Sequence, residues 1–177
     1  MSKINDLTMP APGKHLGRYV FRGAFNESST SINGDRHRIK IFDGRFDTGF
    51  VVRGFAVWGL DTECHGTLRT EGYPLPAPGN PNPNDKNITT MMNANNNVQF
   101  AWASHGSSGS GPSSNSIIDP SYVVIQDMYV FGYATGVSQP WNWIVIADKY
   151  DLSEGTGPLN MVHNQSQGPV GRTDPEN

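Results

Sequence analysis

Strand-like alternation is the feature that most restricts what this chain can fold into. Six segments alternate with the period of two that suits a β-strand, and none shows a convincing helical pattern. The last two of them are expected to form an antiparallel pair. With 177 residues, the chain has the size of one domain with a two-sheet core. We therefore predict an all-β fold, an antiparallel β-sandwich of jelly-roll-like form with extended N- and C-terminal arms. The six segments are residues 18–25, 36–42, 48–60, 98–104, 122–131 and 141–150.

Two of the segments indicate their own place in the sandwich. Residues 48–60 are mostly apolar on both faces apart from Arg53, which predicts a central strand. Gly54 and Gly59 within this segment suggest a bulge or a close neighbouring backbone. Residues 36–42 alternate basic and apolar side chains, so we expect a half-buried strand whose charged face meets water or a partner.

The predicted organisation is one sandwich domain between two arms. The arms are too polar to fold alone, but such segments can order against a neighbouring subunit. A proline-rich and asparagine-rich stretch is expected to run over the surface, and a Gly/Ser-rich stretch is expected to be a flexible loop. The boundaries are residues 1–17 for the N-terminal arm, 18–154 for the sandwich, 73–97 for the surface excursion, 105–116 for the Gly/Ser loop and 155–177 for the C-terminal arm.

Charge and composition argue against several classes of partner. The formal net charge of −3 provides no basic stripe for phosphate groups, so we expect no nucleic-acid partner. The chain contains no apolar stretch of the roughly 20 residues that a membrane helix needs, and residues 1–13 hold no apolar signal region. We expect no membrane partner and no secretion signal. The sequons at Asn26, Asn87 and Asn164 are therefore taken as chance matches.

Reactive residue types gather at one place, Asp61, Glu63, Cys64 and His65. A cysteine nucleophile needs a base and an oxyanion donor in register, and no motif supplies partners for Cys64. We interpret this group as a polar strand end with one half-buried, inert thiol.

Metal and phosphate sites are also weakly indicated. His37, His65 and His163 lie far apart in sequence without zinc-ligand spacing. The glycines of residues 106–111 are not followed by a helical pattern, so we interpret this stretch as a linker rather than a phosphate loop.

Two buried-looking carboxylates and several aromatic residues leave alternatives open. Asp127 and Asp148 fall in apolar strand segments, where they are either tuned catalytic acids or hydrogen-bonded structural acids, and we favour the second. Trp141 with Trp143, and Phe50 with Trp58, share strand faces that suit either a sugar-stacking platform or a core, and we favour the core. We thus predict a protein that is not an enzyme, with no catalytic, cofactor-binding or metal-binding residues and no cofactor.

Several strand motifs carry a family resemblance. Together they cover most of residues 36–167 except the proline-rich stretch, and they resemble small β-rich structural proteins encoded near the capsid genes of marine tailed bacteriophages. The motifs are Ile39-Lys40-Ile41-Phe42, residues 48–55, Ile118-Asp119-Pro120, residues 123–129, residues 144–153 and residues 161–167.

The resemblance implies a virion protein that decorates or cements the capsid. Its expected partners are the major capsid protein and other copies of itself, as a dimer or trimer, and its expected location is the capsid surface after synthesis in the host cytoplasm. Two alternatives remain. One is a carbohydrate-binding adhesin or minor tail module that uses residues such as Trp102 or Trp141. The other is a sandwich-fold hydrolase that uses some of Asp61, Glu63, Asp127 and Asp148.

Overall fold

The computed structural model describes residues 13–25, 35–59, 63–70, 98–108, 111–135 and 140–152. Over these ranges the secondary structure consists of strands, with no helix, and the all-β prediction is confirmed. The strands are β1 (Lys14–Phe25), β2 (Asp35–Ile39), β3 (Thr48–Gly59), β4 (Glu63–Arg69), β5 (Gln99–Ser108), β6 (Gly111–Ile118), β7 (Val123–Val124), β8 (Met128–Thr135) and β9 (Trp141–Asp151).

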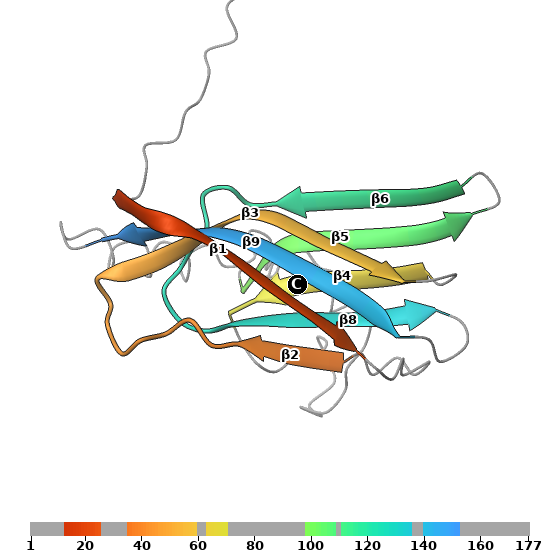
Figure 1. Cartoon of the computed structure of the whole chain (residues 1–177), viewed down its shortest axis with the longest axis horizontal. Coiled ribbons are helices and arrows are strands. Elements are labelled where there is room, and N and C mark those ends of the chain that lie inside the picture. The colour runs from red at the N-terminus through yellow and green to blue at the C-terminus, as the bar shows by residue number, and fades with distance from the viewer. Residues whose placement is uncertain are drawn as a thin grey trace, which may run out of the picture.

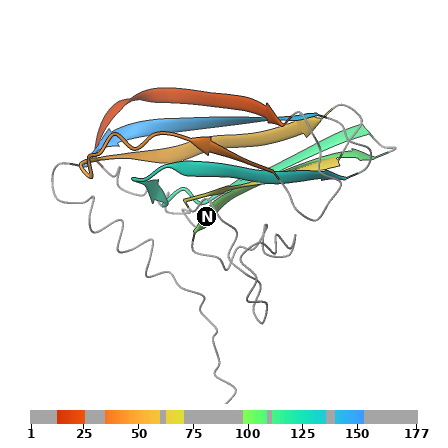
Figure 2. The same cartoon turned by 90° about the horizontal axis from the view of Figure 1, so that it is seen from below.

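The strands form two antiparallel sheets (Figure 1). The four-stranded sheet has the order β1-β9-β3-β7, and the five-stranded sheet has the order β2-β8-β4-β5-β6. Figure 2 shows the layers from the side, with β1, β9 and β3 in one and the teal and green strands of the five-stranded sheet in the other. The predicted antiparallel β-sandwich is therefore confirmed.

The strand orders are those of a jelly roll with one added strand. When β6 is set aside, the sheets read β1-β9-β3-β7 and β2-β8-β4-β5. The chain changes sheet at most connections, so most strands pair with strands distant in sequence, as in the two Greek keys of a jelly roll. The exceptions are β4, β5 and β6, which are consecutive and pair in one sheet.

The core lies between the sheets and takes alternate residues from each strand. In β9, Trp141, Trp143, Val145 and Ala147 point inward and are buried. The central position predicted for residues 48–60 is confirmed, because β3 pairs with β9 on one side and β7 on the other. A second, smaller cluster lies near the end of β9 and contains Val51, Val123, Ile125, Tyr150 and Leu152.

A glycine in β8 makes room for the largest core side chain. Gly66 of β4 lies directly opposite Gly132 of β8, and a Cβ on Gly132 would lie 2.2 Å from Cη2 of Trp141. The indole of Trp141 thus occupies the space that a side chain at position 132 would need. It also stacks on Phe25, with ring centroids 4.4 Å apart.

Two local features of the strands agree with their sequences. The register of β3 against β9 shifts between Val52 and Gly54, which confirms the bulge expected near Gly54. Edge strand β2 exposes Arg36 and Arg38 and buries Ile39, as its alternation predicts. Charged side chains on an edge strand hinder unwanted pairing with other chains.

Two predictions about individual segments are wrong, and one strand is missed. The stretch 105–116, expected to be a flexible loop, lies mostly in the β5–β6 hairpin, whose strands pair from Ala101 with Ile118 to Ser108 with Gly111. Segments 122–131 and 141–150 do not pair with each other: β7 pairs with β3, and β8 pairs with β2 and β4. Strand β4 was not predicted.

The predicted boundaries fall partly outside the described residues. Strand β1 begins at Lys14, so residues 14–17 belong to a sheet rather than to the predicted arm. Residues 1–12, 153–177 and 71–97 are outside the described ranges. Thr70 is the last residue described before residues 71–97, and Val98 is the first one after them. The amide of Thr70 donates a hydrogen bond of 3.1 Å to the carbonyl of Val98.

Candidate functional site

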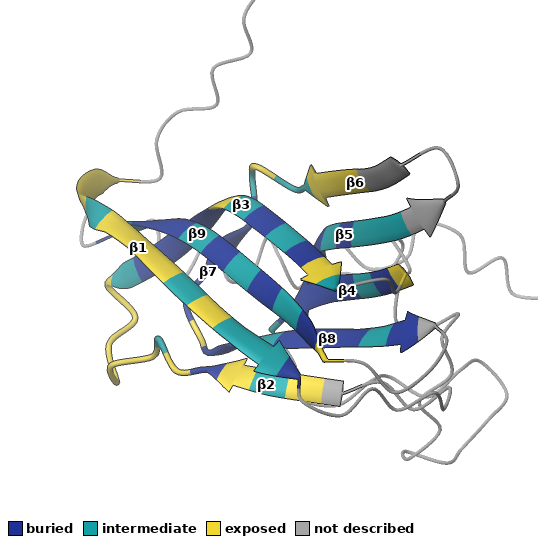
Figure 3. Cartoon of the chain, turned by 45° about the vertical axis from the view of Figure 1, so that its right-hand side comes forward, coloured by how far each residue is buried: buried dark blue, intermediate teal, exposed yellow. Residues whose placement is uncertain are grey.

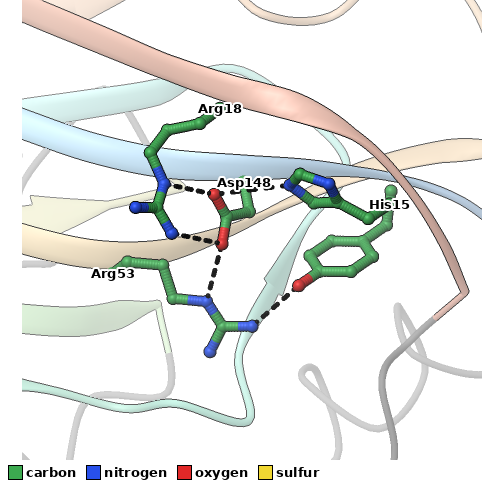
Figure 4. Close-up of polar contacts among 5 residues, drawn as sticks. His15, Arg18, Arg53 and Asp148 are labelled. Atoms are coloured by element: carbon green, nitrogen blue, oxygen red, sulfur yellow. Dashed lines mark hydrogen bonds and ion pairs between the residues drawn. The ribbon is translucent and has the colours of Figure 1, made fainter.

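Asp148 is the centre of a polar network on the four-stranded sheet (Figure 4). Arg18 of β1 donates to both carboxylate oxygens, with Nε 2.8 Å from Oδ1 and the terminal nitrogen 3.3 Å from Oδ2. Arg53 of β3 donates to Oδ2 at 3.2 Å and also reaches the hydroxyl of Tyr150 at 2.9 Å. His15 lies 3.6 Å from Oδ1. The network therefore joins β1, β9 and β3.

Asp127 has a similar structural role between β7 and β8. Its Oδ1 accepts hydrogen bonds of 2.9 Å from the amides of Ile41 and Phe42, and its Oδ2 accepts one of 2.6 Å from Nε of Arg38. The carboxylate thus holds the end of β2 and the start of the next connection against β8.

Both carboxylates are stabilised in their ionised form. The pKa of Asp148 is lowered, chiefly because Arg18 and then Arg53 donate hydrogen bonds to it. Burial opposes ionisation of Asp127, but hydrogen bonds from the Phe42 amide, Arg38 and the Ile41 amide outweigh it and lower that pKa as well. A general acid needs a raised pKa, so both residues fit the structural interpretation that the sequence favoured.

The lowered pKa values predict a loss of stability in acid. A depressed folded-state pKa adds stability above the unfolded value of about 3.9, and that stability disappears as pH falls through the folded value. We expect the free energy of unfolding to be nearly constant above about pH 5 and to fall below about pH 4. In Asp148→Asn, the free energy of unfolding should fall less steeply as the pH decreases, by up to about one fewer proton taken up on unfolding. Urea unfolding at a series of pH values measures this slope. An unchanged slope in Asp148→Asn would contradict the assignment.

The reactive group near Cys64 does not form a catalytic arrangement. Cys64 is buried in the core, and burial, with a smaller effect from Glu63, raises the pKa of its thiol to about 12. Neighbouring residues of a strand point to opposite faces, so Glu63 and His65 project away from the thiol. These two residues contact each other instead, with Nε2 of His65 3.1 Å from Oε1 of Glu63. Asp61 lies outside the described residues.

The other residues considered as site candidates make structural contacts or lie outside the described residues. Trp143 donates a hydrogen bond of 3.1 Å to Nδ1 of His37, which stacks on Phe25. His163 is not described, and within the described ranges no group of three or more His, Cys, Asp or Glu residues is placed to hold a metal ion. Residues 106–108 continue β5, so the expected linker begins as strand.

The tryptophans divide between the core and the surface. Trp141 and Trp143 are buried, which confirms the core interpretation and removes Trp141 as a sugar-stacking residue. Trp102 is half-buried, and its Nε1 donates a hydrogen bond of 3.0 Å to Gln99. Trp58 is 41% exposed, so the core interpretation of this residue is wrong.

Trp58 belongs to a partly exposed, largely apolar surface that we call the outer face. Side chains paired across β1, β9 and β3 share this side of the four-stranded sheet, opposite the core. Val20 at its edge is 57% exposed, and Figure 3 shows β1 largely in yellow beside the alternating β9. The outer face consists of Val20, Arg22, Ala24, Ala56, Trp58, Asn142, Ile144 and Ile146.

The charges on and beside the outer face are predominantly positive. Arg22 lies on it, and Arg18 and Arg53 border it. Among the described residues on this side of the sheet, Asp148 supplies the one carboxylate, and it is already paired with two of these arginines. Alternation in residues 18–25 and in residues 141–150 separates the two faces of each strand. It carries no signal for which face is outward or for the pairing of the two strands.

Comparisons with known proteins identify no relative. No protein-family model matches the chain, and neither a curated protein nor a solved structure shows significant similarity to it. Over the described ranges, no helix has the length and apolar character needed to cross a membrane.

Proposed function

We propose that this chain is a virion structural protein that decorates or cements a bacteriophage capsid by binding the major capsid protein as an oligomer. The outer face is the observation that carries this proposal. An exposed apolar area on a folded sheet commonly marks a surface that binds another protein.

Charge complementarity indicates the chemistry of the partner surface. Arginine is enriched in protein interfaces, and Arg18, Arg22 and Arg53 lie on or around the apolar centre formed by Trp58, Ile144 and Ile146. The partner surface we propose on the capsid protein is therefore apolar at its centre with carboxylates at its rim. Such an interface needs no catalytic group on either side.

The fold is compatible with this role without deciding it. Jelly rolls occur in viral capsid proteins and in lectins, and one fold serves many functions. Two of the carboxylates offered as hydrolase candidates, Asp127 and Asp148, give no support to the enzyme alternative. Among the described residues, Asp127 and Asp148 have different hydrogen-bonding partners, and each is held by arginine.

Copy number in purified particles tests the function directly. We expect mass spectrometry to find this protein at a simple near-stoichiometric ratio to the major capsid protein. A handful of copies would place it at a tail or vertex instead, and absence from particles would overturn the proposal.

A pair of matched variants tests the outer face. Val20→Asp places a carboxylate on the outer face, whereas Ile117→Asp does so on edge strand β6 of the other sheet, where Ile117 is 69% exposed. We expect Val20→Asp to weaken binding to particles stripped of this protein by about tenfold or more, and Ile117→Asp to leave it nearly unchanged. Equal binding by both variants would contradict docking through this face.

A further inference from the structure

A pocket separate from the outer face lies at one end of the sandwich. Its volume is about 270 Å³. Connections and strand ends that are distant in sequence meet there: the β2–β3 connection, the end of β4 and the β7–β8 connection. The lining residues are Arg38, Phe42, Phe46, Thr70, Gln126, Asp127 and Tyr129.

Two exposed phenyl rings form the apolar part of this pocket. Phe42 is 41% exposed and Phe46 is 53% exposed, and their ring centroids are 5.4 Å apart. The rings are tilted by 52° relative to each other, so they present two faces rather than one flat surface. The electron-rich face of an aromatic ring attracts the slightly positive C–H groups on one side of a sugar ring.

The polar part of the pocket is close to electrically neutral. Arg38 is the cation and Asp127 the anion among the lining residues, and the two are joined by an ion pair. A guanidinium has five N–H groups, so Arg38 retains donor capacity beyond the two nitrogens that face Asp127. Gln126 is exposed and carries both a donor and an acceptor, and Thr70 and Tyr129 contribute hydroxyl groups.

The combination of two exposed aromatic rings with a neutral set of polar side chains favours one class of ligand. A strongly anionic ligand would find its charge opposed by Asp127, and a cationic one would find the same carboxylate already satisfied by Arg38. Adjacent hydroxyl groups of a neutral sugar alternately donate and accept hydrogen bonds, as the lining side chains do. Apolar walls with a few placed polar groups are typical of small-molecule sites.

The pocket is held in shape before any ligand arrives. Asp127 fixes the backbone at Ile41 and Phe42 through two hydrogen bonds of 2.9 Å. Further along the same connection, Asp43 accepts a hydrogen bond of 3.1 Å from the Arg45 amide and lies 3.4 Å from Nζ of Lys149. Preorganisation of this kind lowers the entropic cost of binding.

We propose that this pocket binds a neutral pyranose unit of a glycan, stacked on Phe42 and Phe46 and hydrogen-bonded by Arg38 and Gln126. The site shares no residue with the outer face. Glycan binding is therefore a property beyond the proposed capsid function, and either can hold without the other.

Binding of the full chain to an array of neutral and anionic glycans, followed by titration with the best neutral hit, tests this proposal. We expect Phe42→Ala and Phe46→Ala each to weaken binding by about tenfold or more, because each removes a stacking face. Trp58→Ala removes an exposed aromatic side chain on the outer face and serves as the matched control, with affinity expected within about twofold. All three residues are exposed, so folding is checked by thermal unfolding, where surface changes cost within about 0.5 kcal/mol.

Three outcomes would overturn the proposal: no neutral glycan bound, anionic glycans bound alone, or equal affinity in wild type, Phe42→Ala and Phe46→Ala. Binding to capsid particles is measured on Phe42→Ala and Phe46→Ala and is expected to be unchanged. Loss of glycan binding with retained particle binding would then separate this site from the proposed capsid function.

Discussion

Gly132→Ala is expected to destabilise the protein by about 3 kcal/mol, the upper end of the usual cost of overpacking a core. The added Cβ would lie 2.2 Å from Cη2 of Trp141 and 2.5 Å from the carbonyl oxygen of His65. The backbone of β4 cannot retreat easily, because Gly66 pairs with Gly132 in the ladder between β4 and β8. The free energy of unfolding from urea denaturation measures the effect.

Gly54→Ala is the matched control for this substitution. At position 54 the nearest atom to an added Cβ is Cδ1 of Ile146 at 3.3 Å, the tip of a half-buried side chain that can shift. We expect a cost below about 1 kcal/mol there. If Gly132→Ala were as stable as the wild type, the packing of Trp141 over this glycine would be wrong.

Trp141→Phe should reveal the coupling between the two positions. Phenylalanine lacks Cη2 and Cζ2, the two indole atoms that an added Cβ at position 132 would meet. The double variant Gly132→Ala, Trp141→Phe is therefore expected to be less destabilised than the sum of the single variants, by about 1 kcal/mol or more. Strict additivity would mean that the methyl group clashes elsewhere.

The strands that sequence predicts well are those whose own pattern matches their burial. Residues 48–59 are apolar on both faces because β3 lies inside its sheet, and Arg36 and Arg38 point outward because β2 is an edge strand. In both strands the position of the strand in its sheet determines which side chains each face carries. The residue pattern alone is therefore enough to predict the strand.

The strands that sequence analysis misses depend on contacts with neighbouring strands rather than on their own alternation of apolar and polar residues. In β4, residues 66–69 are buried on both faces, and glycine and arginine among them break any apolar alternation. Arg69 is buried with its guanidinium carbon 4.9 Å from the ring centroid of Phe131 on β8, a strand distant in sequence. Strand β6 is rich in serine, and its pairing with β5 overrides weak intrinsic propensity.

The candidate sites depend even more on topology. The segment 122–131 is one apolar run in sequence, yet the chain crosses between sheets at Ile125–Asp127, where the polar pair Gln126 and Asp127 interrupts the run. That interruption was the available signal. The pairing of Asp127 with Arg38, 89 positions away, has no local signal at all. Sites that depend on such contacts can be recognised only from the assembled sheets.

Cys64 in the native protein is expected to react with iodoacetamide about a thousandfold more slowly than an exposed cysteine at the same pH. The thiolate is the nucleophile, and a pKa raised to about 12 leaves about a thousandth of the usual thiolate at neutral pH. The side chain is also fully buried, so reagent access requires an opening of the structure. Mass spectrometry of the alkylated protein over time measures the rate.

The denatured protein provides the control, because alkylation in guanidinium chloride should be fast and complete. Comparison with Gly132→Ala then identifies the route of reaction. If Cys64 reacts only through global unfolding, the destabilised variant should react faster by about the factor that its loss of stability implies, roughly a hundredfold for 3 kcal/mol. Fast alkylation of the stable wild-type protein would mean an accessible, activated thiol beside Glu63 and His65. That result would contradict the buried placement of Cys64 and restore the enzyme alternative, since a reactive cysteine next to an imidazole is the one nucleophilic arrangement that β4 offers.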